Sequence, residues 1–116
     1  LITTNNNILS KVINFGCGYR HIGIISTENK LYMFGDNVKG QCGIREPLYC
    51  HNSNEIMIEN EIIMQIKSGC SHNIIKTNNK YYGFGMNCHG SLLIPMKKTI
   101  QYIYKPELIS QEYLHK

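Results

Sequence analysis

Short apolar runs separated by turn-forming residues are the main pattern of this chain. The runs are four or five residues long, and Ile, Val, Tyr and Phe are frequent in them. Runs of this length between Gly, Asn, Ser or Thr favour strands over helices. The clearest runs are Val12–Phe15, His21–Ile25, Leu31–Phe34, Ile62–Ile66, His72–Ile75 and Tyr81–Phe84, and two more are expected at Glu55–Ile58 and Ile100–Tyr104. We therefore predict an all-β protein with two groups of four short antiparallel strands.

The same order of runs and turns occurs twice in the chain. "KLYMFGDNVKGQCG" begins at Lys30 and "KYYGFGMNCHGSLL" begins at Lys80, at an offset of 50 residues. Further upstream, His21 matches His72 at an offset of 51. We predict that the second copy has lost one residue inside its second strand. A period near fifty residues with four short strands per copy is typical of the blades of a β-propeller.

The repeat divides the chain into four segments. We expect residues 1–11 to be an N-terminal extension or the end of a preceding blade, 12–61 to be the first repeat, 62–110 to be a degenerate second repeat and 111–116 to be a tail. The polar segments Arg45–Asn54 and Pro95–Lys98 are expected to be loops. The segment Glu107–Lys116 fits neither a strand nor a helix cleanly, so both remain open. Because the chain begins at Leu1, we interpret it as a piece of a longer protein.

The charge and the cysteines narrow the class of protein. The net charge of +4 is scattered, Lys97 and Lys98 are the only adjacent basic pair, and the chain has two Arg. A nucleic-acid-binding surface usually shows a clustered basic stripe. Five Cys without a CxxC pair do not indicate a secreted disulfide scaffold. No apolar run reaches the length of a membrane-spanning helix. We therefore expect an intracellular protein of the cytoplasm or nucleus, without a membrane partner.

A family resemblance follows from the matched residues. Gly-x-x-His, a strand that ends in Phe-Gly, and then x-Asn-x-x-Gly-Gln-x-Gly resembles the repeat of the regulator of chromosome condensation family. The second copy departs from the pattern at Met86, Ser91 and Leu93, where Asp, Gln and Gly are expected. The signature positions, to which we assign structural roles, are Gly18, His21, Phe34, Gly35, Asn37, Gly40, Gln41 and Gly43 in the first copy and Gly69, His72, Phe84, Gly85, Asn87 and Gly90 in the second.

The resemblance implies a propeller of about seven blades, of which two copies supply two. A blade must be covered by a neighbour on each of its two faces. Two blades alone bury one such interface and leave two open. We therefore expect the remaining blades to come from the same longer chain or from other copies of this one.

The signature residues are expected to support the fold rather than chemistry. We interpret His21 and His72 as buried histidines that hydrogen-bond the backbone of their turns, because a buried polar group needs a partner. Asn37 and Asn87 are expected to bond nearby backbone. The neighbouring Cys and His residues, such as Cys50 and His51, lack the pairs that structural zinc requires. We predict no catalytic, cofactor-binding or metal-binding residues.

The function expected from the resemblance is binding of other proteins. Our leading hypothesis is a protein-interaction or regulatory module, as in larger proteins such as ubiquitin ligases of the HECT class. The alternative is a guanine-nucleotide exchange factor for a small GTPase of the Ran type, with a chromatin association that the scattered charge does not support. A third alternative is an inactive remnant. The segments 45–54 and 93–99 are the candidate binding loops, because loops carry binding residues more often than the elements they connect.

Overall fold

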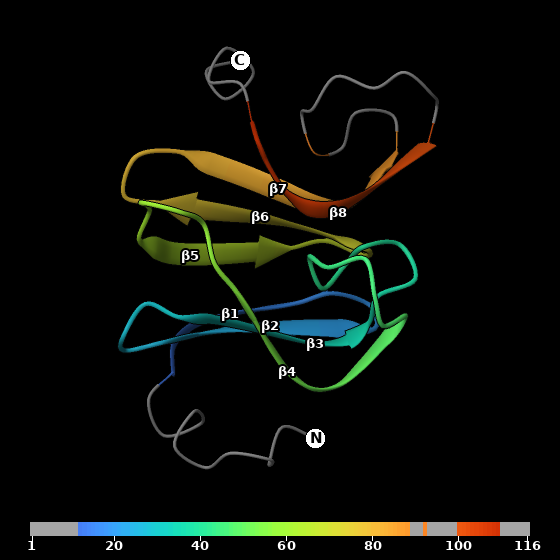
Figure 1. Ribbon diagram of the computed structural model, residues 1–116, viewed down its shortest axis with the longest axis horizontal. Coiled ribbons are helices and arrows are strands. Elements are labelled where there is room, and N and C mark those ends of the chain that lie inside the picture. The colour runs from blue at the N-terminus through green and yellow to red at the C-terminus, as the bar shows by residue number, and fades with distance from the viewer. Residues whose placement is uncertain (1–11, 89–91, 93–99, 110–116) are drawn as a thin grey trace.

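The computed structural model describes residues 12–88, 92 and 100–109. These residues form two four-stranded antiparallel sheets (Figure 1), which confirms the predicted all-β class. The first sheet contains β1 (Val12–Cys17), β2 (His21–Ser26), β3 (Leu31–Asp36) and β4 (Tyr49–Ile56), and the second contains β5 (Ile63–Ser68), β6 (His72–Thr77), β7 (Tyr81–Cys88) and β8 (Ile100–Leu108). Within the described residues, no helix has the length and apolarity needed to cross a bilayer.

Each sheet is a simple meander in which strands adjacent in sequence are adjacent in space. The first strands of the two sheets, β1 and β5, lie side by side in the middle of the molecule, while β4 and β8 lie at its outer sides (Figure 1). β4 and β8 are therefore edge strands, each paired with one neighbour only among the described strands. One core joins the sheets, with Ile25 and Met33 from the first and Ile75 and Phe84 from the second, all fully buried.

The two faces of the first sheet differ in how well they are covered. Ile66 on β5 packs against the face of the first sheet that carries Gly16 and Gly23, and only 2% of its surface is exposed. Phe15 occupies the same repeat position on β1 and is 64% exposed, since it faces away from the second sheet. A second cluster, in which Ile24 and Phe34 are surrounded by Val12, Ile22 and Tyr32, also lies apart from the shared core. The face that another blade would cover is therefore identifiable by comparing equivalent positions.

The fourth strand of each sheet differs from the prediction. β4 begins at Tyr49, so the segment Arg45–Asn54 is a loop only in its first half, and the strand starts six residues before the predicted Glu55. Its sequence is polar because only Cys50 and Ile56 are buried in it. β8 continues to Leu108, which places Glu107 and Leu108 of the undecided tail segment in a strand.

The missing residue of the second copy lies in a turn, which corrects the prediction that it lies in a strand. β2 and β6 are both six residues long, and Val12 pairs with Ser26 just as Ile63 pairs with Thr77. The turn after Ser26 closes with a bond from its N–H to the carbonyl of Lys30, whereas the turn after Thr77 closes at Lys80. The first turn is therefore one residue longer.

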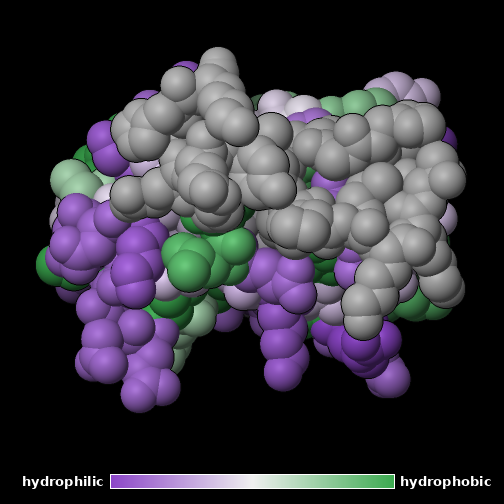
Figure 2. Space-filling view, turned by 90° about the horizontal axis from the view of Figure 1, so that it is seen from above, coloured by the Kyte–Doolittle hydropathy of each residue, from purple (hydrophilic) through white to green (hydrophobic). Residues whose placement is uncertain are grey.

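The surface on the side of the second sheet is mixed in polarity. Hydrophilic side chains project along one edge of the molecule, and hydrophobic residues lie between them (Figure 2). Among the described residues, Tyr102 and Leu108 on β8 are exposed by 43% and 54%. The outer strand of this sheet therefore presents apolar and aromatic side chains to solvent.

Candidate functional site

The Gly-x-x-His spacing of the signature reflects close packing of a glycine against an imidazole ring. A Cβ atom added at Gly18 would collide with the ring of His21, and one added at Gly69 would collide with the ring of His72. In both turns the glycine N–H donates to the histidine carbonyl at 2.9 Å. Any side chain at either glycine would displace the histidine, so the two positions are constrained together.

His21 joins the two sheets through a buried polar network. Its Nε2 lies 2.9 Å from Oδ1 of Asn73, and because an amide oxygen can only accept, the imidazole donates this bond. The same Oδ1 accepts a bond from the Ser68 hydroxyl at 2.6 Å, and the Asn73 amide donates to the carbonyl of Gln41 at 2.6 Å. The partner of the His21 side chain is thus a side chain of the second sheet. We had predicted that His21 would bond the backbone of its own turn. Sequence comparison missed Asn73 because Ile22 stands at its position in the first copy.

Burial controls the protonation of both signature histidines. Desolvation lowers the pKa of His21, and the hydrogen bond to Asn73 opposes part of this shift. Desolvation also lowers the pKa of His72, which is half-buried. The Nδ1 atom of His21 is buried without a hydrogen-bond partner among the described residues. Both rings are therefore neutral near pH 7, and the Nε2 proton of His21 is committed to Asn73.

Asn37 holds the loop 37–48, which follows β3. Its amide donates to the carbonyls of Ile44 at 2.7 Å and Pro47 at 2.8 Å, and its Oδ1 accepts from the N–H of Cys42 at 2.9 Å. In the second copy, Oδ1 of Asn87 accepts from the N–H of Leu92 at 3.0 Å, five residues on as in the first copy. These amides substitute for the strand partners that a loop lacks.

The other signature residues lie at backbone turns and in the core. Gly35, Gly40, Gly43 and Gly85 all have positive φ. The N–H of Asp36, which follows Gly35, donates to the carbonyl of Arg20, the residue before His21. In the same way, the N–H of Met86, which follows Gly85, donates to the carbonyl of Ser71, the residue before His72. Phe34, Phe84 and Gln41 are buried. Gly90 lies outside the described residues.

The loop 37–48 crosses from the first sheet to the second. The Cα of Gly40 lies so close to the carbonyl of Ile103 on β8 that a side chain would not fit. The hydroxyl of Tyr104 donates to the carbonyl of Val38 at 3.3 Å, and Gly43 lies against the ring of Phe84. The loop of one blade therefore covers part of the next blade.

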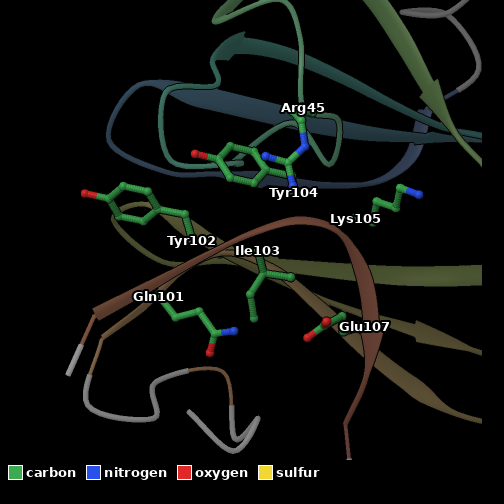
Figure 3. A pocket seen from close by; sticks show the side chains of 7 residues that line it. All are labelled: Arg45, Gln101, Tyr102, Ile103, Tyr104, Lys105 and Glu107. Carbon is green, nitrogen blue, oxygen red and sulfur yellow. The ribbon is translucent and has the colours of Figure 1, made fainter. Parts of the chain in front are cut away.

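A groove of about 310 Å³ lies where this loop meets β8 (Figure 3). The guanidinium carbon of Arg45 lies 4.7 Å from the centroid of the Tyr104 ring, a cation–π contact. The rings of Tyr102 and Tyr104 pack edge to face, with their centroids 6.5 Å apart. The remaining lining residues are Gln101, Ile103, Lys105 and Glu107. We call this feature the Arg45 groove.

The Arg45 groove agrees only in part with the predicted binding loops. Arg45 belongs to the candidate segment 45–54, but the aromatic side chains come from β8, which sequence reasoning treated as a scaffold strand. The segment 93–99 lies outside the described residues. Recurrence is a signal that could have located the groove, because Tyr49 and His51 form an aromatic pair at the equivalent positions of β4, with ring centroids 4.6 Å apart.

A second hollow of about 260 Å³ opens at the rim formed by the turn between β1 and β2. Its lining residues are Tyr19, Arg20, Asp36, Lys39, Gln41 and Ser71. This lining contains two cations, Arg20 and Lys39, and one anion, Asp36. The Arg45 groove has the same balance, with two cations and one anion, and differs in the tyrosine pair that β8 contributes to its lining.

The cysteines of the described residues show no arrangement for metal binding or catalysis. No group of three His, Cys, Asp or Glu side chains in this part of the chain could hold a metal ion. Cys42 and Cys50 are buried beside each other, and desolvation raises the pKa of both thiols. A thiol with a raised pKa is a poor nucleophile and ligand near neutral pH.

Comparison with known proteins identifies the repeat. Residues 12–41 match the model of the regulator of chromosome condensation (RCC1) repeat. No curated protein sequence matches the chain.

Solved structures with the same fold include propellers from human and yeast. Human WBSCR16 is 19% identical with a TM-score of 0.74, and the match covers 85% of this chain and 26% of that one. Prp20p of Saccharomyces cerevisiae, in a structure described with its binding properties to Gsp1p and histones, is 17% identical with a TM-score of 0.74, covering 93% and 27%. Yeast RCC1 (Prp20) bound to Kap60 is 20% identical with a TM-score of 0.66, and the match covers 85% of this chain and 26% of that one. The chain spans about a quarter of these structures, and at such identities the likeness concerns the fold.

Proposed function

We propose that these two blades of an RCC1-type propeller are part of a module that binds other proteins and regulates them, without catalysing a reaction. The observation that carries this proposal is the commitment of the buried polar side chains to structural bonds. His21, Asn73 and Asn37 each hold another part of the fold, while the Arg45 groove leaves a cation and two tyrosines at the surface. Such a surface offers contacts to a partner and no assembled nucleophile and base.

The alternative, nucleotide exchange on a small GTPase, draws its support from the relatives. Prp20p is described with binding properties to Gsp1p, and that statement concerns Prp20p. An exchange factor acts by binding the nucleotide-free GTPase more tightly than the loaded one. No described residue of this chain is matched to that task, so we place this function second.

An intracellular location is part of the same proposal. Cys17 and Cys70 are exposed free thiols, and Cys42 and Cys50 are buried free thiols. Exposed thiols persist more readily in a reducing compartment than in a secreted protein. Cytoplasm and nucleus both satisfy this condition.

The two functions can be separated by one set of measurements on the full-length protein. Proteins retained by the immobilised full-length protein are identified by mass spectrometry, and each is purified and titrated by calorimetry. We expect a defined stoichiometry with at least one of them and no acceleration of labelled-GDP release from a Ran-type GTPase. Accelerated GDP release would favour the exchange function. Turnover of a small-molecule substrate would contradict the proposal.

A further inference from the structure

We infer that the Arg45 groove binds an extended, acidic segment of a partner protein alongside the outer strand β8. This inference rests on the proposed binding function and names the chemistry of the ligand. The argument uses the charge of the groove, the shape of β8 and the repetition of its aromatic pair.

The groove contains one more cation than anion, and the guanidinium of Arg45 is positioned by a tyrosine ring. The guanidinium of Arg45 lies over the ring of Tyr104 (Figure 3). The hydroxyl of Tyr104 also donates to the carbonyl of Val38 at 3.3 Å, so both side chains have a preferred position. Within the described residues, neither Arg45 nor Lys105 forms an ion pair. A guanidinium stacked by its face still has its N–H groups at the edge, where they can bind a carboxylate in two parallel bonds.

Among the described strands β8 pairs only with β7, which leaves its other edge open next to this charge. Gly83 of β7 pairs with Glu107 of β8, and Gly85 pairs with Ile103. One residue of β7 therefore lies opposite three residues of β8, which means that β8 has a bulge with two extra residues. The bulge contains Tyr104 and Lys105, which line the groove. Bulges at sheet edges redirect side chains, and an edge strand can pair with an added peptide strand. An extended segment could therefore place its carboxylates near Arg45 and Lys105.

The aromatic pair beside the bulge supports a protein ligand of this shape. Tyr102 is 43% exposed and Tyr49, its equivalent on β4, is 51% exposed. A similar interruption of the pairing occurs between Met33 and Gly35 opposite β4. The repetition of an exposed aromatic residue before a bulge on both outer strands indicates a recurring surface feature. Extended segments that run across successive blades would meet one such pair on each blade.

Charge complementarity favours an acidic peptide over a nucleic acid. The groove contains two cations and one anion, Glu107. A nucleic acid gains most of its affinity from many phosphate contacts, each with a basic side chain, and its phosphates would be repelled by Glu107. A peptide can place a neutral or basic residue opposite Glu107 and acidic residues opposite Arg45 and Lys105.

The test measures binding of a fluorescein-labelled short peptide rich in Asp and Glu to the full-length protein by fluorescence anisotropy. The matched peptide has Asn and Gln in place of the acids, and a single-stranded oligonucleotide is a third probe. We expect the acidic peptide to bind more tightly than both and its affinity to fall as salt is raised. Arg45→Glu should weaken it by about tenfold or more, whereas Lys67→Ala, on an exposed position of β5, should leave it unchanged.

Two further variants separate charge from fold. Tyr104→Phe keeps the ring under Arg45 and should retain most of the affinity, whereas Tyr104→Leu should lose much of it. Arg45→Gln serves if Arg45→Glu fails to fold. Equal binding of the neutral peptide, tighter binding of the oligonucleotide, or an equal loss in Lys67→Ala would overturn the inference. If the partners identified above still bind the Arg45 variants, the groove is wrong and the proposed function stands; if the full-length protein binds no protein, the proposed function itself fails.

Discussion

The Nε2 of His21 lies 2.9 Å from the Oδ1 of Asn73, and this bond connects the start of the second strand of one blade to the second strand of the next. Asn73 satisfies three partners at once, since it also bonds the Ser68 hydroxyl and the Gln41 carbonyl. A repeat residue, His21, is thus paired with a residue that the other copy lacks.

Asn73→Ala should be one of the most destabilising single changes in the chain. It leaves a buried donor on His21 and a buried carbonyl at Gln41 unpaired, and each unsatisfied group costs about 1–3 kcal/mol. We expect a loss of roughly 3 kcal/mol in the free energy of unfolding, measured by denaturant titration. Asn52→Ala, at an exposed position of β4, is the matched control and should change stability by less than about 0.5 kcal/mol. Equal losses in the two variants would contradict the role of the network.

The stability of the protein should fall when the pH is lowered below neutrality. Burial lowers the folded-state pKa of His21 and of His72, so the unfolded chain binds more protons in the range between the folded pKa values and the ordinary histidine pKa of about 6.5. The stabilising effect of keeping these rings neutral is present above about pH 6.5 and is lost as the pH falls towards the folded pKa values. Urea midpoints measured at several pH values for the wild type and for His21→Gln test this, and the variant should show the weaker dependence. A wild-type stability that rises from pH 7.5 to 5.5 would reverse the sign.

Gly35→Ala should destabilise the protein more than Gly83→Ala. Gly35 has a φ of 105° and lies against the carbonyl of Arg20, so an added methyl group meets both backbone strain and a collision. Gly83 sits in the other sheet without positive φ, and its nearest neighbour would be a Leu92 methyl group at 3.3 Å. We expect a loss of about 2 kcal/mol or more for Gly35→Ala and a small change of either sign for Gly83→Ala. Thermal melts followed by circular dichroism compare the two.

Asn37→Asp should loosen the loop 37–48 without unfolding the sheets. The carboxylate keeps the acceptor for Cys42 but loses the two donors, and it places negative charge beside the carbonyls of Ile44 and Pro47. We expect faster amide hydrogen exchange across the loop, with little change in β2 or β6. Uniform acceleration in all strands would show instead that the loop and the sheets open together.

Phe15 and Ile66 provide a test for the blade that covers the first sheet. In chain 1–116, Ile66→Ala should cost about 2–4 kcal/mol because it leaves a cavity, whereas Phe15→Ala should cost little because Phe15 is already exposed. In the full-length protein the Phe15 variant should become costly as well, since another blade would bury this side chain. Light scattering of chain 1–116 shows whether copies of the chain cover this face instead. A Phe15 variant that is neutral in the full-length protein would mean that no blade packs there.

Much of the fold follows from the sequence because three strands of each sheet carry their own apolar signal. In the second and third strands of each sheet these hydrophobic residues are buried or half-buried, and β1 and β5 show the same apolar pattern although Ile13, Phe15 and Met64 are exposed. β4 was misplaced because an edge strand with two buried residues, Cys50 and Ile56, has no such pattern. β4 pairs with β3 through backbone hydrogen bonds, which form whether the side chains are polar or apolar.

The misplaced deletion shows how matching letters can mislead. The offset of 50 residues aligns Thr27 with the identical Thr77, but the strand pairing makes Ser26 the equivalent of Thr77. Both hydroxyls accept bonds from the N–H groups of their turns, Ser26 from Lys30 at 3.4 Å and Thr77 from Lys80 at 2.9 Å. A shared hydrogen-bonding role defines equivalence here, and serine and threonine fulfil it alike.

The contact between Arg45 and Tyr104 could not be predicted from the sequence, for a different reason. Arg45 and Tyr104 are far apart in the chain and meet only because the loop 37–48 crosses between the sheets. The position of such a loop depends on the bonds of Asn37 and on the close approach of Gly40 to β8. Neither the contact nor its geometry is encoded in a local pattern.

The crossing of the loop 37–48 also determines where the protein could be divided. Gly40 and Gly43, which belong to the first repeat, are packed against Ile103 and Phe84 of the second. A cut at the repeat boundary expected from the sequence, between residues 61 and 62, would remove part of the cover of the second sheet and leave the loop without support. The repeating unit of the sequence therefore does not coincide with the part of the chain that we expect to unfold together. A fragment that contains the second sheet and is expected to fold alone would have to begin at residue 37 or earlier.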